Sequence, residues 1–335
     1  MIKAMLMFRI LALSAVLIAP FEGASAADRL PSGSTYRDVL VATVQDAGKP
    51  YALRANVYLP KGAASAPTPL VLFLHGNGGA YNFANGSRSY EFSIALSDRG
   101  IAVATIDYRP DDALPGEIFD VKAYVRFFRA KAKEYNIDPQ RIAVWGTSRG
   151  GHLGALLATS GDVKELEGDV GGNLDQSSRI QCAVLFYSVV DLLNLGADFA
   201  NRSPESAKAS DAANGLPAQL VGLKDARGMS HLREVAAKND KADASWQAVE
   251  LARFSDPTNY VTKDDPPILL AHSSIDKVVG VEQSEKLYRK YLENGLDANL
   301  FVWSRGAHGA VGLDIEAASA EWLVRKLLVE MAPKN

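Results

Sequence analysis

Residues 142–151 of the chain, IAVWGTSRGG, pass from an apolar segment into a glycine-rich turn. Four consecutive apolar residues are typical of a buried β-strand, and the G-T-S-R-G that follows matches the G-x-S-x-G nucleophile elbow. The apolar residues after the turn predict a helix over Gly150–Thr159. Alone, the pentapeptide would also suit a glycine-rich helix start, but the preceding strand favours the elbow. The stretch therefore predicts a strand–turn–helix unit that presents Ser148 as a nucleophile.

Similar alternation of apolar runs and helical segments extends to both sides of this unit. The predicted buried strands are Leu70–Leu74, Ile101–Ile106, Ile142–Trp145, Cys182–Phe186, Ile268–Ala271 and Leu300–Trp303. The predicted helices are Ser87–Asp98, Glu117–Tyr135, Gly150–Thr159, Gln283–Asn294 and Ala317–Met331. Two β-rich runs before them, Asp38–Val44 and Tyr51–Leu59, predict an antiparallel opening. This pattern indicates an α/β fold with a mostly parallel, eight-stranded sheet covered by helices on both faces.

Residues 192–254 interrupt the alternation. They contain no clear strand and are rich in Ser, Ala, Asn and charged residues. We expect a cap-like insertion after the sixth strand, within a single domain that spans residues 27–335. An insertion at the carboxyl edge of a parallel sheet is well placed to cover a ligand crevice. The alternative is a surface excursion without such a role.

Residues 1–26 have the pattern of a secretory signal peptide. Lys3 and Arg9 supply positive charge, Ile10–Ala19 is apolar, and Ala24-Ser25-Ala26 is a small-residue cleavage site. A membrane anchor is the alternative, but the apolar run is only about half of the roughly 20 residues that span a bilayer. The sequence therefore predicts a secreted or periplasmic protein with no membrane span after cleavage.

The composition and spacing of residues argue against several kinds of partner and cofactor. The formal net charge is −3, and no dense basic stripe with interleaved aromatic residues is present, which argues against nucleic acid. Cys182 is the only cysteine, so an intrachain disulfide is impossible, and its apolar neighbours predict a buried, inert thiol. No His, Cys or carboxylate cluster has metal-ligand spacing, and no nucleotide-binding loop follows a strand. We expect no metal and no cofactor.

A serine hydroxyl is a weak nucleophile at neutral pH, so Ser148 needs a general base that a third group orients. His308 is the predicted base, because its glycine-flanked loop after the last strand can bring an imidazole over the elbow. Asp276, in the loop after Ile268–Ala271, is the predicted acid, and Asp191 remains open as an alternative. The order Ser, Asp, His along the chain is that of α/β-hydrolases. The other four histidines are expected to pack, bond locally or belong to the loop described next: His75, His152, His231 and His272.

The loop HGNGG, residues 75–79, follows the predicted strand Leu70–Leu74. A loop this rich in glycine can turn successive backbone N–H groups into the crevice, where they would stabilise the oxyanion of a tetrahedral intermediate. The backbone amide of Arg149, directly after Ser148, would supply a further donor. A plain glycine turn is the alternative for this loop.

With these motifs the sequence resembles the bacterial esterase and feruloyl-esterase-like branch of the α/β-hydrolases, close to the hormone-sensitive-lipase-like esterases. The resemblance covers almost the whole mature chain and includes the motifs at residues 107–109, 136–145, 166–169, 187–192 and 264–268. It implies that the amides of Asn77 and Gly78 form the oxyanion hole and that Ser148, Asp276 and His308 form the triad. The chain departs from the usual family pattern at Asn77, Arg149 and Ser273.

The expected function is that of an exported carboxylesterase, which forms an acyl-enzyme at Ser148. The resemblance implies short-chain or aromatic acyl esters as substrates, such as acetyl or feruloyl esters of plant polysaccharide. Two alternatives remain. One is a serine peptidase of the prolyl-oligopeptidase type, and the other is a non-catalytic binding protein on a hydrolase scaffold.

Overall fold

The computed structural model describes residues 35–61, 66–76, 87–110, 114–199 and 203–332, so the predicted signal peptide over residues 1–26 lies outside the described residues. Eight strands form one sheet in the order β1-β2-β4-β3-β5-β6-β7-β8. Their bounds are β1 (Thr35–Asp46), β2 (Lys49–Tyr58), β3 (Thr68–Leu74), β4 (Ala102–Ile106), β5 (Ile137–Thr147), β6 (Cys182–Phe186), β7 (Ile268–Ser273) and β8 (Ala298–Trp303). The pairs β1–β2 and β2–β4 are antiparallel, and all the others are parallel. The predicted α/β-hydrolase fold is confirmed.

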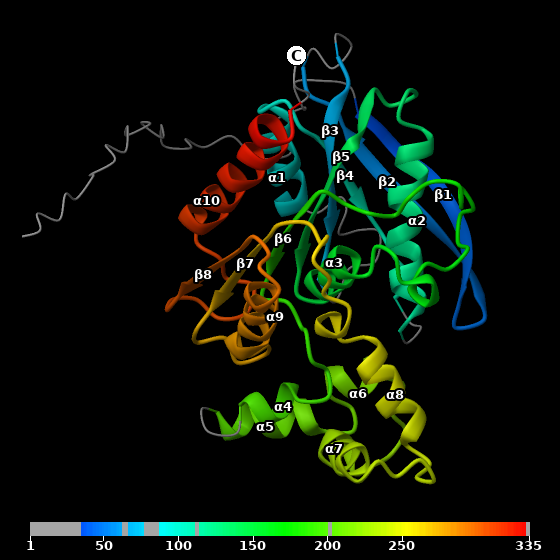
Figure 1. Cartoon of the computed structure of the whole chain (residues 1–335), viewed down its shortest axis with the longest axis vertical. Helices are drawn as coiled ribbons and strands as arrows, with labels where there is room; N and C mark the ends of the chain where they lie inside the picture. The colour runs from blue at the N-terminus through cyan, green and yellow to red at the C-terminus, as the bar shows by residue number, and fades with distance from the viewer. Residues whose placement is uncertain (1–34, 62–65, 77–86, 111–113, 200–202, 333–335) are drawn as a thin grey trace, which may run out of the picture.

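Helices cover both faces of the sheet (Figure 1). One face carries α2 (Gly116–Ala130), α3 (Arg149–Thr159) and α9 (Val281–Glu293), and the other carries α1 (Ser87–Ser97) and α10 (Leu313–Val324). Short 3₁₀ segments occur at η4 (Lys164–Leu166) and η5 (Pro257–Asn259), and α10 continues as the π-helix η6 (Arg325–Glu330).

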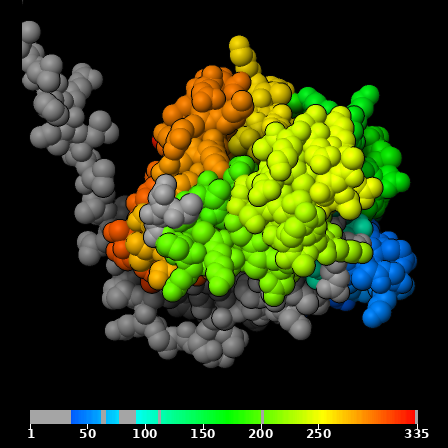
Figure 2. Space-filling model, turned by 90° about the horizontal axis from the view of Figure 1, so that it is seen from below, coloured from blue at the N-terminus to red at the C-terminus, as the bar shows by residue number. Residues whose placement is uncertain are grey.

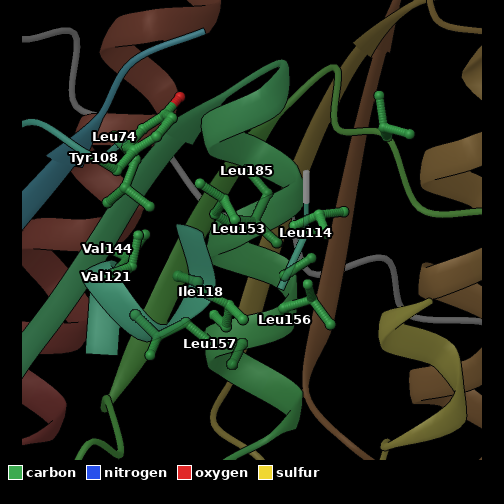
Figure 3. Packing of buried hydrophobic residues seen from close by; sticks show 14 of the residues in the cluster. Leu74, Tyr108, Leu114, Ile118, Val121, Val144, Leu153, Leu156, Leu157 and Leu185 are labelled. Atoms are coloured by element: carbon green, nitrogen blue, oxygen red, sulfur yellow. The ribbon is translucent and has the colours of Figure 1, made fainter. Parts of the chain in front are cut away.

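Neighbouring residues of the central strands point into different cores. Leu72 of β3 belongs to the core beneath α2 and α3, whereas Val71 belongs to the core beneath α10. Figure 3 shows the first core, where Leu153 of α3 packs with Ile118 of α2 and with Leu185 of β6. Each such side chain, when fully buried, contributes about 1.5–3 kcal/mol. Burial on both faces explains why these strands are continuous apolar runs.

Two helix boundaries differ from the sequence prediction by more than two residues. The helix predicted over Glu117–Tyr135 ends at Ala130, because the following residues form turns and Asn136 has a left-handed backbone with φ 49°. The last helix begins at Leu313 and not at Ala317. Asp314 and Glu316 stand in its first turn, where carboxylates interact favourably with the exposed amides and the helix dipole.

The insertion, residues 192–254, lies in the connection from β6 to β7, and the regular secondary structure of its described part is all helical, with turns between the helices. Its helices are α4 (Leu195–Asp198), α5 (Pro204–Asp211), α6 (Leu216–Leu220), α7 (Gly228–Lys238) and α8 (Trp246–Phe254). They gather at the lower end of the molecule in Figure 1. Figure 2 looks at this end and shows the green and yellow insertion spread between the blue N-terminal strands and the orange segment that includes α9. None of the helices in the described ranges is long and apolar enough to cross a membrane.

Candidate active site

Ser148 stands at the turn between β5 and α3 with a strained backbone, φ 54° and ψ −116°. The chain passes so closely here that only glycine fits on either side. A Cβ on Gly150 would lie 2.3 Å from the carbonyl oxygens of Leu74 and His75, and one on Gly146 would lie 2.3 Å from the carbonyl oxygen of Gly150. Strain of this kind persists only where the surrounding structure fixes it. The G-x-S-x-G segment therefore forms a sharp strand-to-helix turn with Ser148 at its apex.

Three side chains from separate loops form one line of hydrogen bonds. His308 Nε2 lies 3.0 Å from Ser148 Oγ, and His308 Nδ1 lies 2.7 Å from Asp276 Oδ2. The other carboxylate oxygen of Asp276 accepts the backbone N–H groups of Val278 and Val279 at 2.8 and 3.0 Å. The structure thus brings together the three residues that the sequence predicts as nucleophile, base and acid.

The charge on Asp276 fixes the tautomer of the histidine. Burial alone would raise the pKa of Asp276, but its contacts with His272, His308 and the Val279 amide hold that pKa well below its ordinary value. An ionised carboxylate only accepts hydrogen bonds, so His308 Nδ1 carries the proton and Nε2 presents its lone pair to the Ser148 hydroxyl. This is the arrangement in which an imidazole can act as a general base.

The rest of the predicted site lies only partly within the described residues. Asn77 and Gly78, the proposed oxyanion-hole residues, lie outside them. The described part of that loop ends at Gly76, where an added Cβ would come within 3.2 Å of Ser148 Cβ. His75 stacks on Tyr108 at 4.5 Å between ring centroids, and the Tyr108 hydroxyl donates to the His75 carbonyl at 2.6 Å. The start of the loop is therefore packed directly beside the nucleophile.

The alternative acid, Asp191, lies elsewhere. Its carboxylate is held by Lys286 Nζ at 3.0 Å and by the Asn194 side chain at 2.8 Å, at the start of the insertion.

Cys182 is buried as predicted, and burial raises the pKa of its thiol well above the usual range. Within the described residues, no group of three or more His, Cys, Asp or Glu side chains could hold a metal ion.

Tyr187 is a site residue that sequence reasoning missed. Its ring meets the ring of His308 edge-on, with 4.7 Å between centroids, and its backbone is left-handed with φ 38°. The preceding carbonyl, of Phe186, accepts the backbone N–H of Ser148 at 3.0 Å. The Tyr187 ring therefore packs against the proposed base, and the residue before it bonds to the backbone of the proposed nucleophile. Its signals in the sequence are its position directly after a predicted strand and its place in the motif at residues 187–192, neither of which indicates a contact with His308.

The side chain of Arg149 extends from the elbow towards α2 and the loop after β4. Its guanidinium pairs with Glu117 at the start of α2, donates to the Pro110 carbonyl at 3.3 Å and lies 5.9 Å from the centre of the Tyr108 ring. Glu117 is fully buried, and this burial raises its pKa to about 8 against the opposing charge of Arg149. The pair ties the first turn of α3 to the first turn of α2.

The raised pKa of Glu117 gives a prediction for stability. In the folded chain Glu117 keeps its proton up to about pH 8, whereas in the unfolded chain it loses the proton near 4.5, so the parent loses stability as pH rises through this window. Gln at this position never ionises. The free energy of unfolding of Glu117→Gln, minus that of the parent, should therefore rise between about pH 5 and pH 8.5 by on the order of 2–5 kcal/mol.

Urea unfolding of both proteins at the two pH values measures this difference. Glu134→Gln makes the same chemical change at an exposed position in the turn after α2 and serves as the control. A difference between Glu117→Gln and the parent that stays constant with pH would contradict the account of the buried carboxyl.

The sheet order, the elbow and the Ser–His–Asp hydrogen bonds define an α/β-hydrolase whose site has the geometry of a serine hydrolase. Comparison with known families agrees. The family model named BD-FAE matches residues 55–291, so the chain belongs to the BD-FAE family.

Two relatives and one solved structure match between about a third and most of the chain. Esterase LipC of Mycobacterium tuberculosis is 28% identical over 241 residues, which cover 70% of this chain and 51% of that protein. An acetylxylan esterase of Xylanibacter ruminicola is 29% identical over 119 residues, 34% of this chain and 22% of that protein. Among solved structures, a truncated carbohydrate esterase from gut microbiota has 26% identity and a TM-score of 0.69, covering 88% of this chain and 97% of that one. The chain spans about half the length of LipC and less of the acetylxylan esterase.

Proposed function

We propose that the protein is a serine carboxylic ester hydrolase that works through an acyl-enzyme on Ser148. The observation that carries the proposal is the single histidine bonded on one side to Ser148 and on the other to a buried, ionised Asp276. The names of the family's relatives, LipC and the acetylxylan esterase among them, support an ester as the bond that is cleaved.

The geometry supports the following sequence of steps. His308 Nε2 takes the proton of Ser148 as its Oγ attacks the ester carbonyl carbon, and Asp276 stabilises the imidazolium that forms. The negative charge on the carbonyl oxygen is held by the proposed amides of Asn77, Gly78 and Arg149. His308 then gives its proton to the departing alcohol, and the acyl group remains on Ser148. Water, activated by the same histidine, releases the acid and restores the serine.

The proposed substrates are short-chain or aromatic acyl esters of carbohydrate. Support comes from the names of two relatives, an acetylxylan esterase and a carbohydrate esterase from gut microbiota. The predicted signal peptide over residues 1–26 adds the proposal that the mature enzyme is exported, to a place where polymeric carbohydrate esters are accessible.

A substrate panel tests this proposal. The panel contains p-nitrophenyl esters of increasing acyl length, methyl ferulate, acetylated xylan and a prolyl peptide p-nitroanilide, each assayed with the parent and with Ser148→Ala. We expect the parent to prefer acetyl or feruloyl esters, with the peptide substrate uncleaved. Preference for long acyl chains would overturn the substrate proposal, and cleavage of the anilide at a comparable rate would favour the peptidase alternative.

We also propose that the insertion covers the crevice and selects among esters. It begins after the carboxyl end of β6, and Ser148, Asp276 and His308 also follow the carboxyl ends of their strands, at the same edge of the sheet. One salt-bridge cluster ties it to the core, because Lys286 Nζ of α9 contacts Asp191 at 3.0 Å and Asp198 at 2.9 Å.

Breaking this link should loosen the insertion without touching the triad. Lys286→Met leaves two carboxylates facing each other without their shared cation, and we expect a loss of about 1–3 kcal/mol in stability. We further expect the ratio of kcat/KM between acetyl and longer esters to change by about threefold or more, which corresponds to roughly 0.7 kcal/mol.

Arg289→Met is the matched control, since Arg289 lies on the same helix but pairs with Glu285 of that helix at the surface. Thermal unfolding and the ester panel measure both variants. If Lys286→Met gives the same selectivity as Arg289→Met, the insertion has no part in choosing the substrate.

A further inference from the structure

A second histidine lies beneath the proposed acid. His272, on β7, is completely buried, and its Nε2 lies 3.6 Å from Asp276 Oδ2, the oxygen that faces His308. The same Nε2 lies 2.9 Å from the carbonyl oxygen of Val279, and Nδ1 lies 2.7 Å from Ser284 Oγ on α9. The ring therefore touches the acid, the turn that follows the acid and the helix behind that turn.

These contacts define which groups donate. A backbone carbonyl only accepts, so His272 Nε2 carries a proton and donates it to Val279. In the neutral ring Nδ1 then accepts, and the Ser284 hydroxyl donates to it. The same Nε2–H group lies close to the Asp276 carboxylate, with Nε2 3.6 Å from Oδ2, and a nearby donor stabilises the charged form of that carboxylate.

The bond to Val279 connects this ring to the orientation of the acid. The backbone of Val279 makes two hydrogen bonds. Its carbonyl accepts from His272, and its N–H donates to Asp276 Oδ1 at 3.0 Å. Val278 N–H donates to the same oxygen at 2.8 Å. With Oδ1 held by two amides, Oδ2 is left directed at His308 Nδ1. A small rotation of the 278–279 turn would turn the carboxylate away from the histidine.

We propose that His272 is a positioning residue, which, with Ser284 behind it, fixes the turn at Val278–Val279 and so aims the carboxylate of Asp276 at His308. This inference rests on the proposed esterase function. Groups that orient the direct partners of a reacting centre commonly change activity by about 10–100-fold when removed. The role differs from simple core filling, because it predicts an effect on the bond between Asp276 and His308 beyond any effect on stability.

The chain contains a matched control for this role. His152 on α3 is also completely buried, and its Nδ1 lies 3.0 Å from the carbonyl oxygen of Val189, but it has no contact with Asp276 or His308 among the hydrogen bonds and ion pairs of the described residues. Replacing either ring removes a buried imidazole and its bond to a backbone carbonyl. Only the change at His272 removes a group that touches the acid.

The experiment compares His272→Leu, His272→Gln, Ser284→Ala and His152→Gln with the parent. The measurements are thermal unfolding, kcat and KM on p-nitrophenyl acetate, and the downfield ¹H NMR signal of the His308 Nδ1 proton bonded to Asp276. For His272→Leu we expect kcat to fall by about 10–100-fold with KM changed less than about threefold, and the NMR signal to be lost or moved upfield. His272→Gln retains a donor near Nε2 and should recover most of the loss.

Ser284→Ala removes only one oxygen atom from the core, so it tests the positioning role even if His272→Leu fails to fold. We expect a decrease in kcat of about 3–10-fold and a shift of the NMR signal in the same direction as for His272→Leu. His152→Gln should lose stability but keep the signal. The positioning role is wrong if His272→Gln and Ser284→Ala both fold and both keep the parent's kcat and NMR signal, and if His272→Leu either fails to fold or is also unaffected. An inactive parent would instead overturn the esterase proposal on which it rests.

Discussion

Ser148→Ala is expected to lower kcat for ester hydrolysis by about 10⁵–10⁶-fold while leaving the fold intact. The change removes only Oγ, whose partner in the structure is His308 Nε2 at 3.0 Å. Alanine experiences the same strain at φ 54° as serine does, so the turn should keep its shape. The remaining rate would come from the oxyanion hole and from substrate binding, which act without a nucleophile on the enzyme.

The measurement is steady-state hydrolysis of p-nitrophenyl acetate together with thermal unfolding. Ser160→Ala is the matched control, because Ser160 is a buried serine at the other end of α3 whose hydroxyl donates to the Leu156 carbonyl at 2.6 Å. We expect this control to keep the parent's kcat. Turnover by Ser148→Ala within tenfold of the parent would rule out Ser148 as the nucleophile.

Asp276→Asn should lower kcat by about 10⁴-fold with little effect on folding. The carboxylate accepts the Nδ1 proton of His308 and thereby leaves Nε2 free to take the proton of Ser148. A carboxamide can turn its NH₂ group towards Nδ1, which favours the other tautomer and places a proton on Nε2, where the base is needed. The barrier then increases because the general base is lost, although all three side chains remain in place.

Asp191→Asn is the comparison, since Asp191 also follows a predicted strand and was the alternative acid. Its carboxylate contacts Lys286 and Asn194 and has no contact with His308 among the described interactions, so we expect kcat within about threefold of the parent. Steady-state rates and unfolding temperatures of the two variants decide between them. A folded but nearly inactive Asp191→Asn beside an active Asp276→Asn would mean that the triad is wrongly assigned.

The fold could be predicted from sequence because its central strands are buried on both faces. Runs such as Leu70–Leu74 and Cys182–Phe186 are apolar throughout, and they coincide with strands of the structure. The first half of β5, from Ile137, was missed because it contains polar residues and Pro139. Its pairing with Thr68 is a tertiary contact, which no local pattern contains.

In the candidate site, too, the residues set by local sequence patterns could be predicted, and those set by tertiary contacts could not. Ser148 is recognisable because the elbow is a local turn with its own glycine requirements, and the order of Asp276 and His308 along the chain follows from the order of the strands. The Glu117–Arg149 pair and the contact of Tyr187 with His308 depend on how separate elements pack, so spacing alone gave no sign of them. His272 was expected to bond locally, and it does, but only the structure shows that one of its neighbours is the proposed acid.

The central claim is that His308 and Asp276 activate Ser148, and labelling with a fluorophosphonate tests it most directly, because this reagent modifies an activated serine in preference to ordinary ones. Trypsin cleaves after Arg141 and Arg149, so the serine lies in the short peptide of residues 142–149, IAVWGTSR. We predict that the parent is labelled stoichiometrically on Ser148 in this peptide and that His308→Ala is labelled far more slowly. Absence of label from the folded parent, or label on another serine, would contradict the account.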